Sequence, residues 1–211
     1  GGGPGAGPVG VKSFLEPYLP VPRIVSEEGR FSLDYDKGES IGKVRSMFGN
    51  FAVLVRAYAY ILANGGDGLR EVSQRAVLNS NYLKSRVTGA YEMPFAQLRK
   101  HEFVISAKKL AKEKGVHATD VAKALLDRGF MSPTVYFPSL VEEALMVEPT
   151  ETESKETLDR YAQAMLEIAA ADPQEIKGSP RSTSISRVDE VYAAKELILS
   201  WRTYQRKRGG P

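Results

Sequence analysis

The sequence predicts a mixed α/β fold, and three observations support this prediction. Short segments rich in β-branched residues, HEFVIS, TVYFP and EALMVEP, lie between segments with helical periodicity. A mostly apolar run ends at a Gly-Gly pair, which is typical of a buried helix and its C-terminal cap. Of the 211 residues, 42% are hydrophobic and 26% charged, as in a globular protein with one good core or two small ones.

The first part of the chain is predicted to contain a loop, a hairpin and two helices. Gly1 to Pro22 alternates glycine and proline and cannot hold a long regular element. Between Arg23 and Gly42, apolar residues alternate with period two, which predicts a short strand or hairpin. Phe48 to Asn64 is apolar nearly all round and is expected to be a helix buried on most faces. Leu69 to Val87 carries one apolar stripe, and we expect this second helix to pack against the first.

The second part is predicted to be a small α/β domain with a C-terminal extension. The expected strands lie within residues 101–106, 134–138 and 143–149, and the expected helices are Thr119 to Arg128 and Ser154 to Ala171. Asp172 to Ser186 collects Pro, Gly, Ser and Thr and is typical of a linker. A last helix is expected from Asp189 to about Tyr204, before a basic end.

Composition and charge exclude several classes of function. The chain has no cysteine, so disulfides, thiolate nucleophiles and Cys-bound metals are excluded. Its two histidines are far apart in sequence, so we expect no metal site. No apolar run is long enough to span a bilayer, and a cytoplasmic setting is the default expectation. The net charge of +3 comes from 29 basic and 26 acidic residues that are interleaved, so no nucleic-acid surface is predicted.

Two glycine-containing segments are candidates for anion binding. The opening GGGPGAGP brings Gly1, Gly2, Gly3 and Gly5 together, but it fits neither common phosphate-binding pattern, so a linker and a functional loop stay equally open. The segment SIGKVRSMFGN places Ser46 and Asn50 before the first predicted helix. The free amides at a helix N-terminus favour anions, although capping of the helix explains the same residues.

Three further candidates lie at the ends of predicted strands. His101 sits beside Glu102 at the start of one strand, where an acid or base role is possible, although a lone histidine at a strand edge is more often structural. Glu148 and Thr150 follow another strand, at the position where α/β proteins often place functional side chains. Helix capping is the alternative for this segment. His117 has no evident partner in sequence and is expected to be exposed.

Five segments together resemble the C-terminal half of glycine dehydrogenase (decarboxylating), the P-protein family of the glycine cleavage system. In chain order they are GGGPGAGPVGVKSFLEPYLP, SIGKVRSMFGNFAVLVRAYAYILANGG, HEFVIS, SPTVYFPSLVEEALMVEPTETESKETLDRYAQAM and SRVDEVYAAKELILSW. The match runs from residue 1 to about residue 202. The form of Arg45 to Leu62 is more similar to subunit 2 of the two-subunit bacterial and archaeal enzyme than to the fused enzyme. Met131 departs from the family, which commonly has His there.

The resemblance implies a fold of the aspartate-aminotransferase type, in which a large domain holds pyridoxal phosphate and a small C-terminal domain closes over it. Residues 1–85 would then be the end of the large cofactor-binding domain, and residues 86–172 the small α/β domain. Residues 173–211 would form a linker, a terminal helix and a basic tail. The Schiff-base lysine of the family belongs to a His-Lys motif upstream of the glycine run. We therefore expect no catalytic residue in this chain, and no activity from the chain alone.

The activity implied by the resemblance is decarboxylation of glycine on pyridoxal phosphate, with transfer of the aminomethyl group to the lipoyl group of H-protein. A partner subunit 1 is implied as well. By position, the family would place Gly1, Gly2, Gly3 and Gly5 along the cofactor and substrate cavity. It would place Ser46 and Asn50 near this cavity or the subunit boundary, and His101, Glu148 and Thr150 on the small-domain side of the cleft.

Two alternatives stay open at the level of sequence. The first is another pyridoxal-phosphate enzyme of the same fold, such as a desulfurase or a group II decarboxylase. The second is a non-catalytic binding module that uses the basic tail around Arg206 to Arg208. Such a basic tail is more often a solvated chain end.

Overall fold

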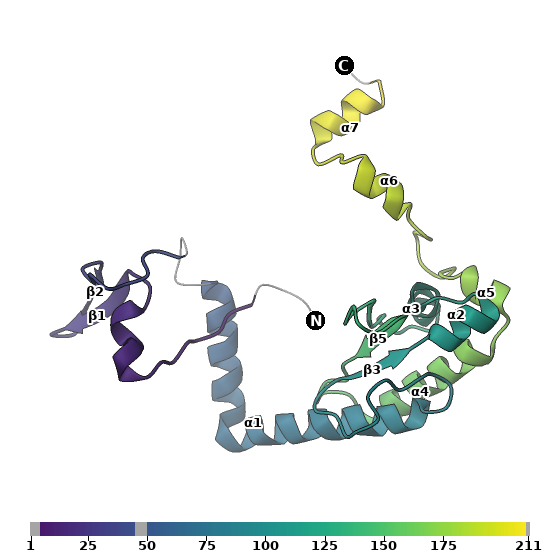
Figure 1. The fold of residues 1–211 in the computed structure, drawn as a ribbon, viewed down its shortest axis with the longest axis horizontal. Helices are drawn as coiled ribbons and strands as arrows, with labels where there is room; N and C mark the ends of the chain where they lie inside the picture. The colour runs from purple at the N-terminus through teal and green to yellow at the C-terminus, as the bar shows by residue number, and fades with distance from the viewer. Residues whose placement is uncertain (1–4, 45–49, 210–211) are drawn as a thin grey trace. The chain divides into compact units, whose positions relative to one another are not determined.

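The computed structural model describes residues 5–44 and 50–209. The chain divides into two compact units, Gly1–Leu69 and Arg70–Pro211, which are described separately below. The boundary falls inside the long helix α1 (Phe51–Val87), shown in Figure 1. The predicted packing between the two parts of this helix, and the predicted domain bounds, remain predictions.

The first unit contains a 3-10 helix, η1 (Ser13–Tyr18), and an antiparallel hairpin of β1 (Arg23–Glu27) and β2 (Arg30–Asp34). The turn between the strands has two residues, Glu28 and Gly29, with φ of 49° and 79°. Positive φ at both positions gives a turn whose twist matches that of the strands, and glycine adopts it without strain. The predicted hairpin is confirmed.

Helix α1 begins at Phe51 and leaves helical geometry at Gly65, whose φ is 63° and ψ is −177°. The Gly-Gly pair predicted to end the first helix therefore interrupts a helix that resumes after it. The expectation that residues 48–64 are buried on most faces is wrong for the described part. Phe51 is 76% exposed and Tyr58 is 65% exposed, because no described residue of this unit covers the apolar surface of the helix.

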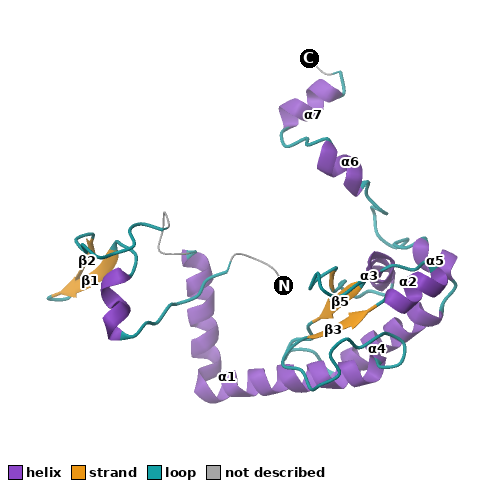
Figure 2. Cartoon of the chain, viewed as in Figure 1, coloured by secondary structure: helices purple, strands orange, loops and turns teal. Residues whose placement is uncertain are grey.

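The second unit is built on an antiparallel sheet of β3 (Phe103–Ser106), β5 (Ala144–Val147) and β4 (Thr134–Val135), in that spatial order. The four helices of this domain that follow α1 are α2 (Lys108–Lys114), α3 (Ala118–Asp127), α4 (Lys155–Ala170) and α5 (Pro173–Lys177). In Figure 2 the helices α3 and α4 lie beside the sheet, and the C-terminal part of α1 runs beneath it. The predicted small α/β domain is thus present.

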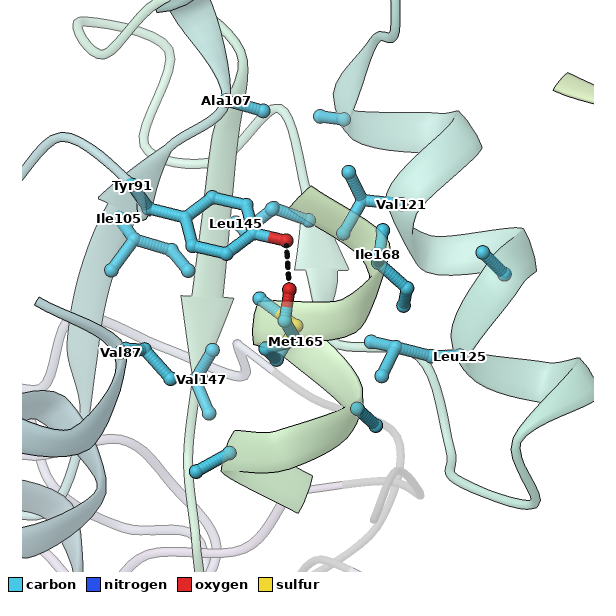
Figure 3. Close-up of a cluster of buried hydrophobic side chains, with 14 of the residues drawn as sticks. Val87, Tyr91, Ile105, Ala107, Val121, Leu125, Leu145, Val147, Met165 and Ile168 are labelled. Carbon is cyan, nitrogen blue, oxygen red and sulfur yellow. Dashed lines mark hydrogen bonds between the residues drawn. The ribbon is translucent and has the colours of Figure 1, made fainter. Parts of the chain in front are cut away.

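The core of this unit lies between one face of the sheet and the helices. Period two in the strands turns Phe103 and Ile105 of β3, with Leu145 and Val147 of β5, toward this core. Figure 3 shows how Ile105, Leu145 and Val147 of the sheet meet side chains of α3 and α4, including Leu125, Met165 and Ile168. The Tyr91 hydroxyl donates a hydrogen bond of 3.0 Å to the carbonyl of Met165, which satisfies its only polar atom inside the core.

Two element predictions need correction, and one helix was not predicted. The segment predicted as a linker contains α5, because Ile176 is 1% exposed and anchors it in the core. The last helix is two short helices, α6 (Glu190–Lys195) and α7 (Trp201–Lys207), separated at Glu196, where the backbone becomes non-helical. Helix α2 was not predicted, since its seven residues are too few to show periodicity. Among the described residues, none of the helices combines the length and apolar character needed to cross a membrane.

Candidate functional site

The face of the sheet opposite the core carries the predicted small-domain residues. On this face Val104 of β3 pairs with Met146 of β5, and both side chains are only partly buried. Because side chains alternate along a strand, Glu102 and Glu148 extend this row at one end of the sheet. The two strands therefore bring together residues that are more than forty positions apart in the sequence.

His101 lies at this end of the sheet between two carboxylates. Its Nε2 atom is 3.7 Å from Oε1 of Glu148 and 3.9 Å from Oε2 of Glu102. The histidine side chain is 54% exposed, so a ligand in solution can reach it. An imidazole that a ligand can reach is able to accept and return a proton.

Thr150 lies in the loop that follows β5, and this loop is fixed by α1. The side-chain amide of Asn79 donates hydrogen bonds to the carbonyl oxygens of Thr150 at 2.8 Å and of Glu153 at 3.3 Å. The Thr150 hydroxyl is 2.8 Å from that of Thr152. The residue that caps α4 is Ser154, because its hydroxyl accepts a hydrogen bond from the Thr157 amide. Capping therefore does not explain the presence of Thr150.

A second loop beside His101 is held by a buried lysine that the sequence analysis did not single out. The Lys84 ammonium donates to the carbonyl oxygens of Phe95, Ala96 and Gln97 at 2.9, 2.8 and 2.7 Å. Burial lowers the pKa of Lys84, and the nearby charge of Arg99 lowers it further. The only sequence signal for a buried lysine here is that Lys84 falls between Leu83 and Val87, which belong to the core.

Asn81 completes the attachment of this loop to α1. Its side chain accepts a hydrogen bond from the Arg99 amide at 2.9 Å and donates one to the Arg99 carbonyl at 2.7 Å. With Asn79 and Lys84, it gives α1 three polar side chains that hold the loops on either side of His101 and Glu148. The second part of α1 is therefore the scaffold of this site.

The predicted cofactor residues are placed only in part. Gly1, Gly2, Gly3 and Ser46 lie outside the described residues. Within the first unit, Asn50 donates a hydrogen bond of 3.3 Å from its side chain to the carbonyl of Gly5, so these two predicted residues do meet. Asn50 also precedes the first turn of α1, because its carbonyl accepts from the Leu54 amide at 3.0 Å.

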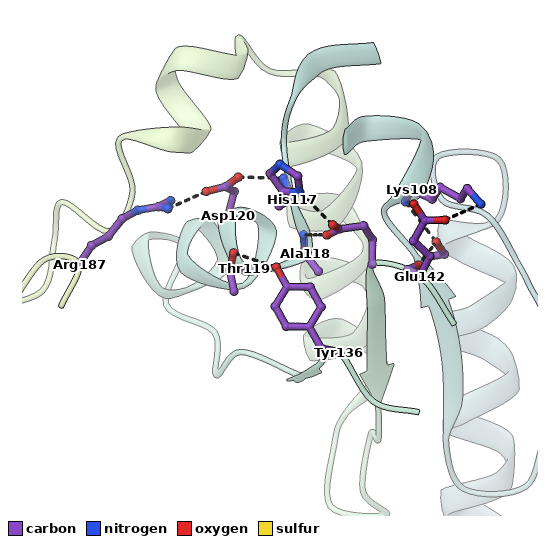
Figure 4. Close-up of polar contacts among 10 residues, drawn as sticks. Lys108, His117, Ala118, Thr119, Asp120, Tyr136, Glu142 and Arg187 are labelled. Carbon is purple, nitrogen blue, oxygen red and sulfur yellow. Dashed lines mark hydrogen bonds and ion pairs between the residues drawn. The ribbon is translucent and has the colours of Figure 1, made fainter. Parts of the chain in front are cut away.

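His117 was expected to be exposed, with no evident partner in sequence, and the structure gives it a partner that lies far along the chain. Its Nδ1 atom is 2.8 Å from Oε1 of Glu143, whose other oxygen accepts from the Ala118 amide at 2.7 Å (Figure 4). The Asp120 side chain accepts from the His117 amide and pairs with Arg187 at 2.6 Å. These contacts satisfy the N-terminal amides of α3 and give the cluster a structural role.

No group of His, Asp and Glu side chains that could hold a metal ion is found in the part of the chain that the structure describes. The His101 group lies on an open sheet face, and the His117 group caps a helix.

Comparisons with known proteins agree on one family. A family model described as "Glycine dehydrogenase, C-terminal domain" matches residues 72–195. The chain is 55% identical over 212 residues to a protein of Pyrococcus abyssi (strain GE5 / Orsay) named "Probable glycine dehydrogenase (decarboxylating) subunit 2". Proteins with the same name are 56% identical in Pyrococcus furiosus and 53% identical in Thermoplasma acidophilum. These alignments cover 95–97% of this chain but 42% of each relative, so the chain spans less than half their length.

The fold is shared with a solved structure, the "Crystal structure of glycine decarboxylase (P-protein) of the glycine cleavage system, in inhibitor-bound form". The TM-score is 0.59 at 21% sequence identity, over 74% of this chain and 37% of that one. The predicted α/β fold is confirmed by this likeness and by the sheet and helices described above. The family model covers more than half of the chain, and it includes His101, Glu148 and Thr150. The chain therefore belongs to the glycine dehydrogenase C-terminal domain family.

Proposed function

We propose that this chain is the C-terminal part of subunit 2 of a glycine dehydrogenase (decarboxylating), a cytoplasmic enzyme of glycine catabolism. The observation that carries the proposal is the identity of about 55% to proteins of that name over almost the whole chain. The reaction is decarboxylation of glycine with transfer of its aminomethyl group to the lipoyl group of H-protein. Because the relatives are named as subunit 2, the proposed assembly includes a subunit 1.

His101, Glu148 and Thr150 are proposed to line the substrate cleft from the small domain. The support is geometric: the imidazole lies 3.7 Å from the Glu148 carboxylate at the open end of the sheet, and loops fixed by α1 flank both. An imidazole in this position can hold a proton at Nε2, with the Glu148 carboxylate beside it. The fixed loops keep this pair in place when substrate enters.

Pyridoxal phosphate is the proposed cofactor of the complete subunit, and when bound it supplies the electron sink for loss of carbon dioxide. Gly5 and Asn50 fit one wall of such a site, since nothing lies within 4 Å of a Cβ placed at Gly5 and the Asn50 amide holds its carbonyl. With Gly1, Gly2 and Gly3, they are the proposed cofactor-binding residues. Small residues of this kind allow the backbone to approach a ligand closely.

The first unit supports the proposal that the chain works as part of a longer subunit. Among its described residues Pro22 alone is buried, and large apolar side chains of α1 such as Phe51 and Tyr58 are exposed. A helix that is apolar on most sides is normally covered by other protein. The relatives have the additional length to cover it, since this chain spans 42% of theirs.

The test is an assay of a full-length subunit 2 that contains this sequence, combined with subunit 1, pyridoxal phosphate and lipoylated H-protein. We expect exchange of labelled bicarbonate into the glycine carboxyl group that depends on H-protein. The variant His101→Ala should lower this exchange at least tenfold, since general acid–base groups contribute roughly 100-fold or more. The matched control is His117→Ala, which removes the structural histidine. Absence of exchange, or release of sulfur from cysteine instead, would contradict the proposal.

A further inference from the structure

A cavity of about 200 Å³ lies on the open face of the sheet, beside His101. Most of its lining residues are apolar and come from four segments of the chain: Phe95, Phe103 with Val104, Phe137 with Pro138, and Met146. Two charged side chains, Arg99 and Glu102, complete the lining. The reaction proposed above assigns no role to this cavity or to Arg99.

The Arg99 side chain is held at this cavity with its charge unpaired. Its guanidinium carbon lies 5.5 Å from the centre of the Phe95 ring, and within the described ranges it forms no ion pair with a carboxylate. Stacking on an aromatic face leaves the N–H groups at the edge of the guanidinium free to donate. The arginine therefore presents donors suited to a carboxylate.

The loop that carries Arg99 is fixed by two side chains of α1. Lys84 uses all three of its donors on the carbonyl oxygens of Phe95, Ala96 and Gln97. Asn81 binds the backbone of Arg99 itself on both sides. A buried ammonium is costly unless it is fully hydrogen-bonded, and here complete bonding fixes the loop. Arg99 thus has a defined position before any ligand arrives.

Glu102 gives the cavity its opposite charge. Its closest basic partner is His101, 3.9 Å away, which carries charge only when protonated. The cavity therefore combines a guanidinium, a carboxylate and an apolar interior. A zwitterionic α-amino acid carries the complementary groups, and an apolar side chain suits the walls. Engineered cavities of about 150 Å³ hold benzene, so a side chain the size of leucine fits.

We propose that this cavity binds an apolar α-amino acid, with its carboxylate on Arg99, its ammonium group on Glu102 and its side chain against the apolar walls. Lys84 and Asn81 act as positioning residues for Arg99. The proposal does not depend on the proposed reaction, because it concerns a ligand other than glycine and its main contact, Arg99, has no role in that reaction.

The test uses amide NMR spectra of the 211-residue chain during titration with L-leucine, isocaproate, isoamylamine and glycine. Isocaproate lacks the ammonium group, isoamylamine lacks the carboxylate, and glycine lacks the apolar side chain. We expect L-leucine to shift the amide signals of the cavity residues. Each of the other three compounds should bind at least about tenfold more weakly than L-leucine. Equal affinity for glycine or isocaproate would overturn the proposal.

Two variants test which group of the ligand binds Arg99 and which binds Glu102. Arg99→Gln should weaken L-leucine and isocaproate about tenfold, since each loses a charge-assisted hydrogen bond. Glu102→Gln should remove the advantage of L-leucine over isocaproate. The matched control is Arg160→Gln, because Arg160 also lies over an aromatic ring, that of Phe130, but away from the cavity. L-leucine binding that survives Arg99→Gln would overturn the assignment. If that variant failed to fold, the ligand series on the unchanged chain would still decide.

Discussion

Asp127 ties the segment after α5 to the end of α3. Its Oδ1 atom accepts hydrogen bonds from the amides of Arg181 and Ser182, both at 2.7 Å, and from the Ser182 hydroxyl at 2.8 Å. Partial burial alone would raise the pKa of Asp127, but these donors lower it from an ordinary 3.8 to about 2. The donors stabilise the charged carboxylate, so its contribution to folding depends on pH.

The first prediction concerns this pH dependence. Because the pKa is lower in the folded state, the stabilisation is present above pH 4 and is lost as pH falls from about 4 to about 2. Asp127→Asn should lower the free energy of unfolding by about 1–2 kcal/mol at pH 7, after allowance for solvent screening. Urea unfolding followed by circular dichroism at pH 7 and at pH 2 measures this, and the variant and the parent should converge at pH 2.

Asp172→Asn is the control for that measurement. Asp172 also accepts a backbone amide, that of Gln174 at 2.7 Å, but it does so as the N-cap of α5. Asparagine caps a helix as well as aspartate, so this variant should leave stability nearly unchanged. An Asp127→Asn variant as stable as its parent at pH 7 would contradict the role given to the three donors.

Single residues also show how far sequence reasoning reaches at the site. His101 and Glu148 could be predicted as neighbours in function, because each lies at an end of a predicted strand and paired strands bring such ends together. The roles of Lys84 and Arg99 could not be predicted from the sequence. The partners of Lys84 are backbone carbonyls of a loop, and any residue type provides a carbonyl. No sequence pattern therefore marks the loop or the arginine that it carries.

At the scale of elements, predictions succeeded where the core imposes a period. The strand β3 and the helices α3 and α4 were found within one or two residues, because each buries one regular row of side chains. The short elements α2 and α5 were missed, because each has a single buried residue, Leu110 in α2 and Ile176 in α5, and one residue shows no period. The single helix predicted in place of α6 and α7 was too long, because neither α6 nor α7 has a buried residue whose packing would hold a longer helix.

Two serine caps allow a matched test of which helices contribute to stability. Ser154 caps α4 through the Thr157 amide at 3.1 Å, and Ser200 caps α7 through the Thr203 amide at 3.2 Å. Helix α4 contributes several side chains to the core, whereas α7 contributes none. Ser154→Ala should lower the free energy of unfolding by about 1 kcal/mol, and Ser200→Ala should leave it unchanged. Equal effects in urea unfolding would show that α7 is part of the cooperative core.

Gly65 and Gly66 form a second matched pair. Gly65 has φ of 63° and ψ of −177°, a conformation that is almost exclusive to glycine, whereas Gly66 does not have positive φ. Gly65→Ala should destabilise the first unit by about 1–3 kcal/mol, because alanine is strained in this conformation. Gly66→Ala should instead raise helix content slightly, since alanine favours helix over glycine by about 1 kcal/mol. Thermal unfolding by circular dichroism compares the two, and a stabilised Gly65→Ala variant would mean that the helix runs on through this point.

At the scale of the whole molecule, the two units differ in how much apolar surface they bury. The second unit has a continuous core that reaches from Leu83 to Ile176. The described part of the first unit buries Pro22 alone, and it exposes large apolar side chains along the hairpin and along α1. Stability in proteins follows buried apolar area, so the two units should not protect their backbone amides to the same degree.

Hydrogen exchange measured by mass spectrometry tests this difference and its proposed cause. In the 211-residue chain alone, amides of β3, β5 and α4 should exchange slowly, and those of residues 51–64 should exchange at least about 100-fold faster, because local opening there exposes little further apolar surface. In a full-length subunit 2 that contains this sequence, residues 51–64 should become as protected as β3, whereas the protection of β3 itself should not change. Equal protection of the two units in the chain alone would show that the first unit has a core of its own. Residues 51–64 that stay unprotected in the full-length subunit would show that the additional length does not cover this helix.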